Sequence, residues 1–172
     1  AWRDADQFVI CGAGPNSGKA LFSAAKILEA SGDTAVGQDT EEWAHLQYFG
    51  RQVTTPTIFI GAGGADESRA LELVTAAKAI GRRVAAVAPQ GSALATHSGL
   101  DFVWETPALS RAEGPPSREC FSPLLTCLPG TLFAAYRAQL LNEPYFRGFG
   151  GGRNVEGGGG ISRIRSSEQI EE

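Results

Sequence analysis

Short apolar runs alternate with longer stretches of helical periodicity along most of this chain. Residues 7–11 form an apolar run that Gly12 closes, and residues 18–31 place their apolar side chains along one helical stripe. The same succession of apolar run, glycine turn and amphipathic stretch recurs at residues 57–60 and 67–80. A strand, a tight turn and a helix are therefore expected twice in the first half of the chain.

The remaining elements continue this alternation. Further strands are expected at residues 34–37, 83–88 and 101–105, and further helical segments at 40–49, 92–97 and 123–141. Strands that alternate with helices form parallel sheets through right-handed crossovers, and the crossover helices cover both faces of the sheet. The pattern thus predicts an α/β fold, a three-layer αβα sandwich.

The pattern changes at the end of the chain. Residues 143–172 are rich in glycine and arginine and hold too few apolar residues to build a core. We therefore expect one domain over residues 1–142, followed by a separate C-terminal tail. Glycine hinges on both sides of Arg153 suggest a closing flap that brings this guanidinium to a bound phosphate, and a solvated tail is the alternative interpretation.

Composition narrows the classes of function. The 172 residues carry a formal net charge of −4, which disfavours binding to nucleic acid or to an anionic membrane. No apolar run approaches the roughly 20 residues of a membrane span, and the first residues do not resemble a secretory signal. A cytoplasmic location is therefore expected. The sequence contains no Met, which is consistent with a segment of a longer polypeptide.

Cysteine usage gives no sign of a disulfide framework or a zinc site. Cys11, Cys120 and Cys127 are odd in number and lack the spacing of metal-binding pairs. We expect all three to be reduced, with Cys11 buried at the end of a strand. Neither a metal nor an organic cofactor is expected.

Both glycine turns lie where a doubly wound parallel sheet binds its ligands. Residues 12–18 and 61–68 each join the carboxyl end of a strand to the start of a helix, where free N–H groups attract anions. Glycines that only form tight turns are the plainer explanation. The residues predicted to contact a phosphate at these turns are Gly14, Pro15, Asn16, Ser17, Lys19 and Ser68.

Two nucleotide-binding motifs come close to the first turn. Ala13 and Ala20 stand where a P-loop requires Gly and Ser or Thr, so the hydroxyl that binds Mg²⁺ is missing. The glycines at positions 12, 14 and 18 are one residue too widely spaced for the dinucleotide fingerprint G-x-G-x-x-G. Nucleotide binding therefore ranks third among the hypotheses for this chain.

The first turn and a later helix together resemble a known family. Residues 12–21 read G-A-G-P-N-S-G-K-A-L, and residues 41–45 read E-E-W-A-H. This order resembles the sugar-isomerase (SIS) domain family, in particular the second SIS domain of glucosamine-6-phosphate synthase and related tandem phosphosugar isomerases. The resemblance extends through residues 56–89 and 124–144. It implies a five-stranded parallel sheet, doubly wound in the flavodoxin-like manner, that binds a phosphorylated sugar. It also implies a second SIS domain, from the same longer chain or from a dimer partner.

The resemblance also implies an activity, aldose–ketose isomerisation. In that reaction a carboxylate moves a proton between the two carbons beside the carbonyl group. Alignment on His45 matches Glu42 to the base, and partial burial would bring the pKa of such a carboxylate toward neutrality. Two plainer interpretations stay open: Glu42 as a first-turn acid that stabilises the helix dipole, and His45 as a packing side chain.

Two features favour another class of function, a non-catalytic sugar-phosphate sensor or regulatory domain. The turn at residues 61–68 has only Ser68 as a hydroxyl, whereas catalytic SIS domains hold phosphate there with several Ser and Thr. No Lys follows Lys78, so this chain cannot supply the tail lysine that the synthase uses for imine formation. The isomerase half and the sensor are both carried forward as hypotheses.

Overall fold

The structure is a computed structural model that describes residues 2–108 and 118–143. Its centre is a five-stranded parallel sheet with the strand order β2-β1-β3-β4-β5. The strands are β1 (Gln7–Gly12), β2 (Thr34–Gln38), β3 (Thr57–Ile60), β4 (Val84–Pro89) and β5 (Phe102–Thr106). The flavodoxin-like, doubly wound sheet that the resemblance implied is therefore confirmed.

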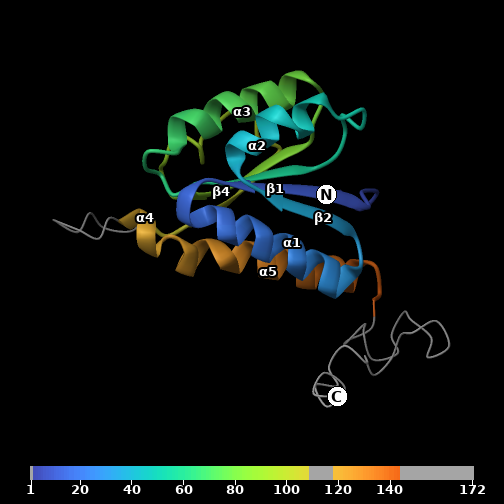
Figure 1. The fold of residues 1–172 in the computed structure, drawn as a ribbon. Coiled ribbons are helices and arrows are strands. Elements are labelled where there is room, and N and C mark those ends of the chain that lie inside the picture. The colour runs from blue at the N-terminus through green and yellow to red at the C-terminus, as the bar shows by residue number, and fades with distance from the viewer. Residues whose placement is uncertain (1, 109–117, 144–172) are drawn as a thin grey trace, which may run out of the picture.

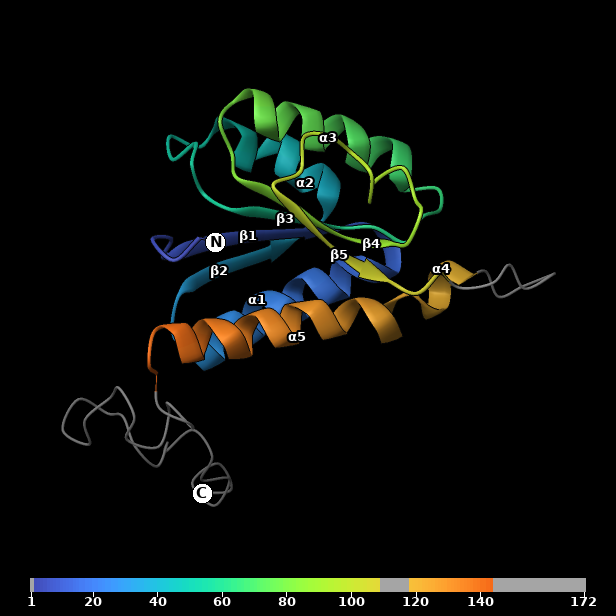
Figure 2. The ribbon, with the colours of Figure 1, turned by 180° about the vertical axis from the view of Figure 1, so that it is seen from behind.

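Helices cover both faces of this sheet. On one face lie α1 (Ser17–Ser31) and α5 (Pro123–Leu140), and on the other lie α2 (Thr40–His45) and α3 (Glu67–Ala79), as Figure 1 and Figure 2 show. The short elements are η1 (Gly14–Asn16), η2 (Gln47–Phe49) and α4 (Arg118–Phe121). The predicted three-layer sandwich is thus correct. No helix in the described part of the chain is long and apolar enough to span a membrane.

Alternate strand residues supply a core on each side of the sheet, because successive side chains of a strand point to opposite faces. The core under α2 and α3 includes Val9, Cys11, Trp43, Phe59, Leu73, Val74, Val84 and Ala86. The core under α1 and α5 includes Phe8, Ile10, Ala20, Ala24, Ile27, Ile58, Ile60 and Ala134. Together these two cores fix the register of every strand, since a shift by one residue would exchange the two faces.

The strand order places the two glycine turns next to each other. β1 pairs with β2 on one side and with β3 on the other, so the chain changes its direction of winding at β1. Gly12 lies opposite Ile60 in the β1–β3 pairing, and the two turns therefore begin from adjacent positions. In open α/β sheets, ligands bind outside the carboxyl ends of the strands at such a point.

The helix predicted over residues 40–49 is shorter than expected, because it ends with α2. Asp39 caps the start of this helix, and its side chain accepts a hydrogen bond from the Glu41 N–H at 2.8 Å. After α2 the chain turns through η2, where the Tyr48 ring packs edge-on against the buried Trp43 at 6.0 Å. Packing of this aromatic pair against the core thus outweighs the helical pattern of the sequence.

Two further segments differ from the sequence prediction. The helical turn expected at residues 92–97 is a series of hydrogen-bonded turns rather than a helix. The helix α4 lies just before α5 in a stretch for which no helix was expected.

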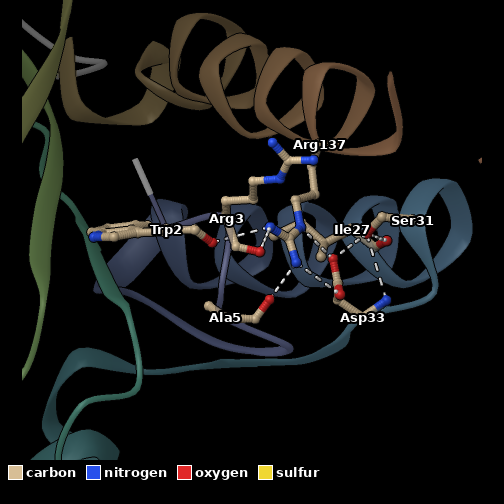
Figure 3. Close-up of polar contacts among 7 residues, drawn as sticks. All are labelled: Trp2, Arg3, Ala5, Ile27, Ser31, Asp33 and Arg137. Carbon is tan, nitrogen blue, oxygen red and sulfur yellow. Dashed lines mark hydrogen bonds and ion pairs between the residues drawn. The ribbon is translucent and has the colours of Figure 1, made fainter. Parts of the chain in front are cut away.

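A buried ion pair fastens the second half of α5 to the rest of the domain. Arg137 Nε donates to Asp33 Oδ2 at 2.8 Å, and the two side chains are only 4% and 8% exposed. The Nη atoms of Arg137 donate to the carbonyl oxygens of Trp2, Arg3 and Ala5 (Figure 3). One guanidinium therefore joins α5 to the N-terminal segment and to the turn that follows α1.

Candidate functional site

The turn after β1 is tight enough to require its first glycine. A Cβ on Gly12 would lie 2.4 Å from the carbonyl oxygen of Asn16, which is closer than any real side chain could come. Gly14 has a φ of +52°, in the left-handed region that favours glycine. The Asn16 N–H donates to the Ala13 carbonyl at 3.0 Å. The turn thus brings the start of α1 against the end of β1 and leaves Gly14 and Pro15 exposed.

The Asn16 side chain is fully buried and contacts the start of α5. Its Nδ2 donates to Ser122 Oγ at 3.2 Å, and its Oδ1 accepts a hydrogen bond from Thr126 Oγ1 at 2.7 Å. The Ser122 hydroxyl donates in turn to the Glu119 carbonyl oxygen at 2.8 Å. Both ends of the Asn16 amide are therefore engaged within the protein, and the amide positions one hydroxyl group just before α5 and one in its first turn.

Carboxylates of the chain itself occupy the turn after β3. The Asp66 side chain accepts hydrogen bonds from the N–H groups of Ala62 at 3.1 Å and Gly64 at 3.3 Å. Glu119, from α4, accepts one from the Ala65 N–H at 3.0 Å. Successive backbone N–H groups in a turn form an anion site, and here two side chains are the anions. A phosphate at this turn would have to displace them or experience their repulsion.

A cavity of about 270 Å³ opens beside this turn, at the carboxyl ends of β3, β4 and β5. It is lined by Gly61, Ala62, Gly63, Glu67, Pro89, Gln90, Gly91, Ser92, Ala93, Thr106, Pro107, Ala108, Ser122, Leu125 and Thr126. Among the described residues, the lining includes several hydroxyl groups, one amide and the carboxylate of Glu67, but neither Lys nor Arg. Ser122 and Thr126 are the hydroxyls that Asn16 positions, so the first glycine turn supports the wall of the cavity.

Glu42 and His45 both lie on the exposed surface of α2. The Nε2 atom of His45 is 3.3 Å from the neighbouring Glu41 Oε1. Arg69, from α3, donates to both oxygens of Glu41 at 2.7 and 2.8 Å. These hydrogen bonds from Arg69 hold the pKa of the Glu41 carboxyl below its usual value. Glu41 is thus the ion-paired acid of this helix, while Glu42 faces solvent near the carboxyl edge of the sheet.

The other predicted contacts are spread over several elements. Ser17 is half-buried at the first position of α1, and Ser68 is exposed in the first turn of α3. The ammonium group of Lys19 lies over the Phe22 ring, 5.3 Å from the ring centroid, and so extends along α1. Arg153 lies outside the described residues. The structure therefore gathers residues 14–17 at one turn. Ser68 lies in α3, the helix that follows the adjacent strand β3.

Sequence reasoning missed the residues that fill the second turn and line the cavity. Ser122 and Thr126 are four positions apart at the start of an apolar helix, a spacing that places two hydroxyls on one face. Asp66 follows a run of glycines, where an Asp side chain often bonds to the nearby backbone. Glu119 gave no such signal, because its partner Ala65 is 54 residues away in the sequence.

The cysteines and the acidic residues give no metal centre in the described part of the chain. No group of three or more His, Cys, Asp or Glu side chains among the described residues could hold a metal ion. The three cysteines form no disulfide bond with one another, and Cys11 is buried at the end of β1 as predicted. Burial raises the pKa of the Cys11 thiol above its usual value, so this group is an unreactive part of the core.

Comparison with known proteins gives no match to a family model and none to a curated protein sequence. Solved structures do match. The C-terminal domain of glucosamine-fructose-6-phosphate aminotransferase from Francisella tularensis aligns over 85% of this chain with a TM-score of 0.71 and 15% identity. The chain has the SIS-domain fold. The likeness in sequence that residues 12–21 and 41–45 suggested is thus confirmed at the level of the fold.

Two further solved structures share this SIS-domain fold. Tagatose-6-phosphate ketose/aldose isomerase from Escherichia coli aligns over 81% of the chain with a TM-score of 0.60 and 18% identity. An Escherichia coli CFT073 protein in complex with A5P aligns over 79% with a TM-score of 0.59 and 19% identity. This chain spans 39% of the aminotransferase chain, 37% of the tagatose-6-phosphate isomerase chain and 71% of the third.

Proposed function

We propose that this SIS domain binds a phosphorylated sugar at the carboxyl ends of its strands. The cavity at the ends of β3, β4 and β5 is the observation that carries the proposal. Ser122 donates its proton to the Glu119 carbonyl oxygen and accepts one hydrogen bond from Asn16 Nδ2, and Thr126 donates its proton to Asn16 Oδ1. Each hydroxyl oxygen therefore retains at least one lone pair for a further hydrogen bond. Such oxygens accept hydrogen bonds from the hydroxyl groups of a sugar. The names of the tagatose-6-phosphate isomerase and of the aminotransferase agree with this ligand class.

We infer that the phosphate group binds at residues 14–17 rather than at the turn after β3. The first turn is exposed and precedes a helix of 15 residues, whose N-terminus favours an anion. The turn after β3 already holds Asp66 and Glu119. Lys19, Ser68 and Arg153 are proposed as additional contacts that close on the phosphate when the ligand is bound.

We further propose that the domain catalyses isomerisation of the sugar phosphate, with Glu42 as the base and His45 beside it. A carboxylate acts as a base near neutral pH when burial raises its pKa, and Glu42 is exposed in the isolated domain. The proposal therefore requires a second SIS domain that covers the exposed surface of α2. Such an arrangement makes this chain one half of a sugar-phosphate isomerase.

A sugar-phosphate sensor is the second candidate, and one observation favours it. Asp66 and Glu119 neutralise the anion-binding N–H groups of the turn after β3, where a catalytic domain would need them for substrate. A domain modified in this way can still bind a sugar at the cavity without holding it for proton transfer. Binding would then change the stability or the partners of the domain rather than the ligand.

One experiment tests the proposal and separates its two forms. The full chain is incubated with fructose 6-phosphate in deuterated water, and both thermal stability and deuterium incorporation beside the carbonyl carbon are measured. Stabilisation with exchange identifies the isomerase half, and stabilisation without exchange identifies the sensor. If a panel of sugar phosphates produces no stabilisation, the sugar-phosphate proposal is wrong.

Glu42→Gln tests the base directly, and Glu41→Gln is its matched control in the same helical turn. We expect Glu42→Gln to abolish exchange with an unchanged fold, because the side chain is exposed. Glu41→Gln removes the partner of Arg69 but leaves the proposed base, so exchange should persist. Exchange that survives in a folded Glu42→Gln protein would contradict the assignment.

A further inference from the structure

A second cavity of about 270 Å³ lies at the other edge of the sheet, away from the glycine turns. Its walls come from the amino ends of β1 and β2, the segment after α2 and the turn before β4. The lining residues are Gln7, Phe8, Val9, Thr34, Val36, Gln47, Gly50, Arg51, Gln52, Thr55 and Arg82. Two of these residues are arginines, and none is acidic. The cavity is therefore positively charged, in contrast to the one at the carboxyl edge.

Arg82 is the residue that makes this cavity unusual. The side chain is charged, yet the residue is only 2% exposed. Its Nη2 donates to the carbonyl oxygen of Gln47 at 2.6 Å, while its buried Nε–H has no hydrogen-bond partner among the described residues. Within that part of the chain, no carboxylate forms an ion pair with it.

Three other arginines of the chain have the ion pair that Arg82 lacks among the described residues. Arg69, Arg83 and Arg137 each form an ion pair with at least one carboxylate. Burial without such a counter-charge is unfavourable for a guanidinium, and it lowers the pKa of Arg82 from its usual value. An anion bound in the cavity would supply the missing counter-charge.

The lining indicates the chemical class of that anion. A guanidinium matches the oxygens of phosphate, and Arg51 at the exposed rim supplies a second positive charge suited to a dianion. The amides of Gln7 and Gln52 and the hydroxyl of Thr34 add donors for further oxygens. The cavity volume of about 270 Å³ is large enough for a phosphate group.

We propose that this cavity is a second ligand site, which binds a small phosphoryl anion through Arg82 and Arg51. It lies at the opposite edge of the sheet from the proposed sugar-phosphate site and shares no lining residue with that cavity. The two proposals are therefore independent, and either can fail without the other.

Arginine side-chain NMR gives a readout specific to this cavity. The full chain, labelled with ¹⁵N, is titrated with inorganic phosphate while the Nε–H resonances are recorded, and Arg82→Lys identifies the signal of Arg82. We expect that signal to shift in a saturable manner, whereas the signal of Arg83, paired with Asp4, stays nearly constant. An Arg82 signal that does not move, or that moves equally with chloride, would overturn the proposal.

Thermal unfolding provides a second measurement, with Arg82→Met compared against Arg83→Met. Without phosphate, Arg82→Met should be at least as stable as the parent, because it removes a buried unpaired charge. With phosphate, the parent and Arg83→Met should gain stability, and Arg82→Met should lose at least part of that gain. Equal gains in all three proteins would mean that phosphate binds only elsewhere, and would refute the proposal.

Discussion

At the scale of single residues, the Asp33 carboxylate is where a small change should have the largest effect on stability. It accepts hydrogen bonds from Arg137 at 2.8 Å and from Ser31 at 2.7 Å, and it is the counter-charge of a buried guanidinium. Asp33→Ala would leave that guanidinium unpaired, and we expect the free energy of unfolding to fall by about 3–5 kcal/mol. Urea denaturation followed by tryptophan fluorescence measures the loss.

Asp4→Ala is the control for this prediction. It removes the partner of Arg83, but the Asp4 side chain is 79% exposed, and surface ion pairs contribute little. Similar losses in the two variants would show that the Asp33 pair is not the anchor of α5.

Residue roles were predictable where the chemistry is local. Asp39 caps α2 and Gly81 adopts a φ of +98° after α3, and both follow from nearest neighbours in the sequence. Asn16 was expected to contact phosphate, but its amide bonds to residues 106 and 110 positions away. The sequence pattern does not show which distant hydroxyl group will form a hydrogen bond with a given amide. For the same reason, the burial of Arg82 was not foreseen.

At the scale of elements, the contact between α1 and α5 depends on one glycine. A Cβ on Gly130 would lie 2.1 Å from Ser23 Oγ and 2.7 Å from Ser23 Cβ, so the two helices would have to move apart. We expect Gly130→Ala to destabilise the domain by about 1–3 kcal/mol, despite the better helix propensity of alanine. The loss is measured from the shift of the urea midpoint.

Gly18→Ala is the matched control, because an added Cβ there meets nothing within 4 Å. That change should be neutral or stabilise α1 by up to about 1 kcal/mol. A Gly130→Ala variant as stable as Gly18→Ala would contradict close helix packing at this point.

Elements were predicted well where a strong hydrophobic period spans the whole segment. The strands and the helices α1, α3 and α5 have such periods, and their positions agree with the sequence to within a few residues. α2 was predicted too long because the period continues into residues that turn away to pack Tyr48 on Trp43. α4 has only four residues, too few to show any period.

At the scale of the whole molecule, the two edges of the sheet differ in charge. The carboxyl edge combines a hydroxyl-lined cavity with Asp66, Glu67 and Glu119, while the amino edge holds a cavity with two arginines and no acid among its lining residues. The two proposals assign a sugar to the cavity at one edge and a phosphoryl group to the cavity at the other. Binding at either edge would stabilise the folded domain, so the two ligands should make additive contributions to its thermal stability.

The outer surface of the α1–α5 layer is unusually apolar for a free domain. Its exposed large side chains are Leu21, Leu28, Leu124, Leu128, Leu132, Tyr136 and Leu140, which we call the α1–α5 apolar face. Between this face and the edge strand β5 lies a groove of about 700 Å³. Exposed apolar surface of this kind marks an interaction site. The partner that we propose for it is a second copy of this chain, which is a contact separate from the domain that the catalytic proposal requires over α2.

The last prediction concerns that partner, taken as a second copy of this chain. We expect the full chain to self-associate in sedimentation velocity over a concentration series, and Leu132→Asp to weaken the association more than about tenfold, or about 1.4 kcal/mol. The reason is that Leu132 is 54% exposed at the centre of the α1–α5 apolar face, where a carboxylate would be buried without a partner. Leu46→Asp, at a site 58% exposed on the other side of the sheet, should associate like the parent. A parent chain that stays monomeric at every concentration, or a Leu132→Asp chain that associates equally well, would contradict pairing through this face.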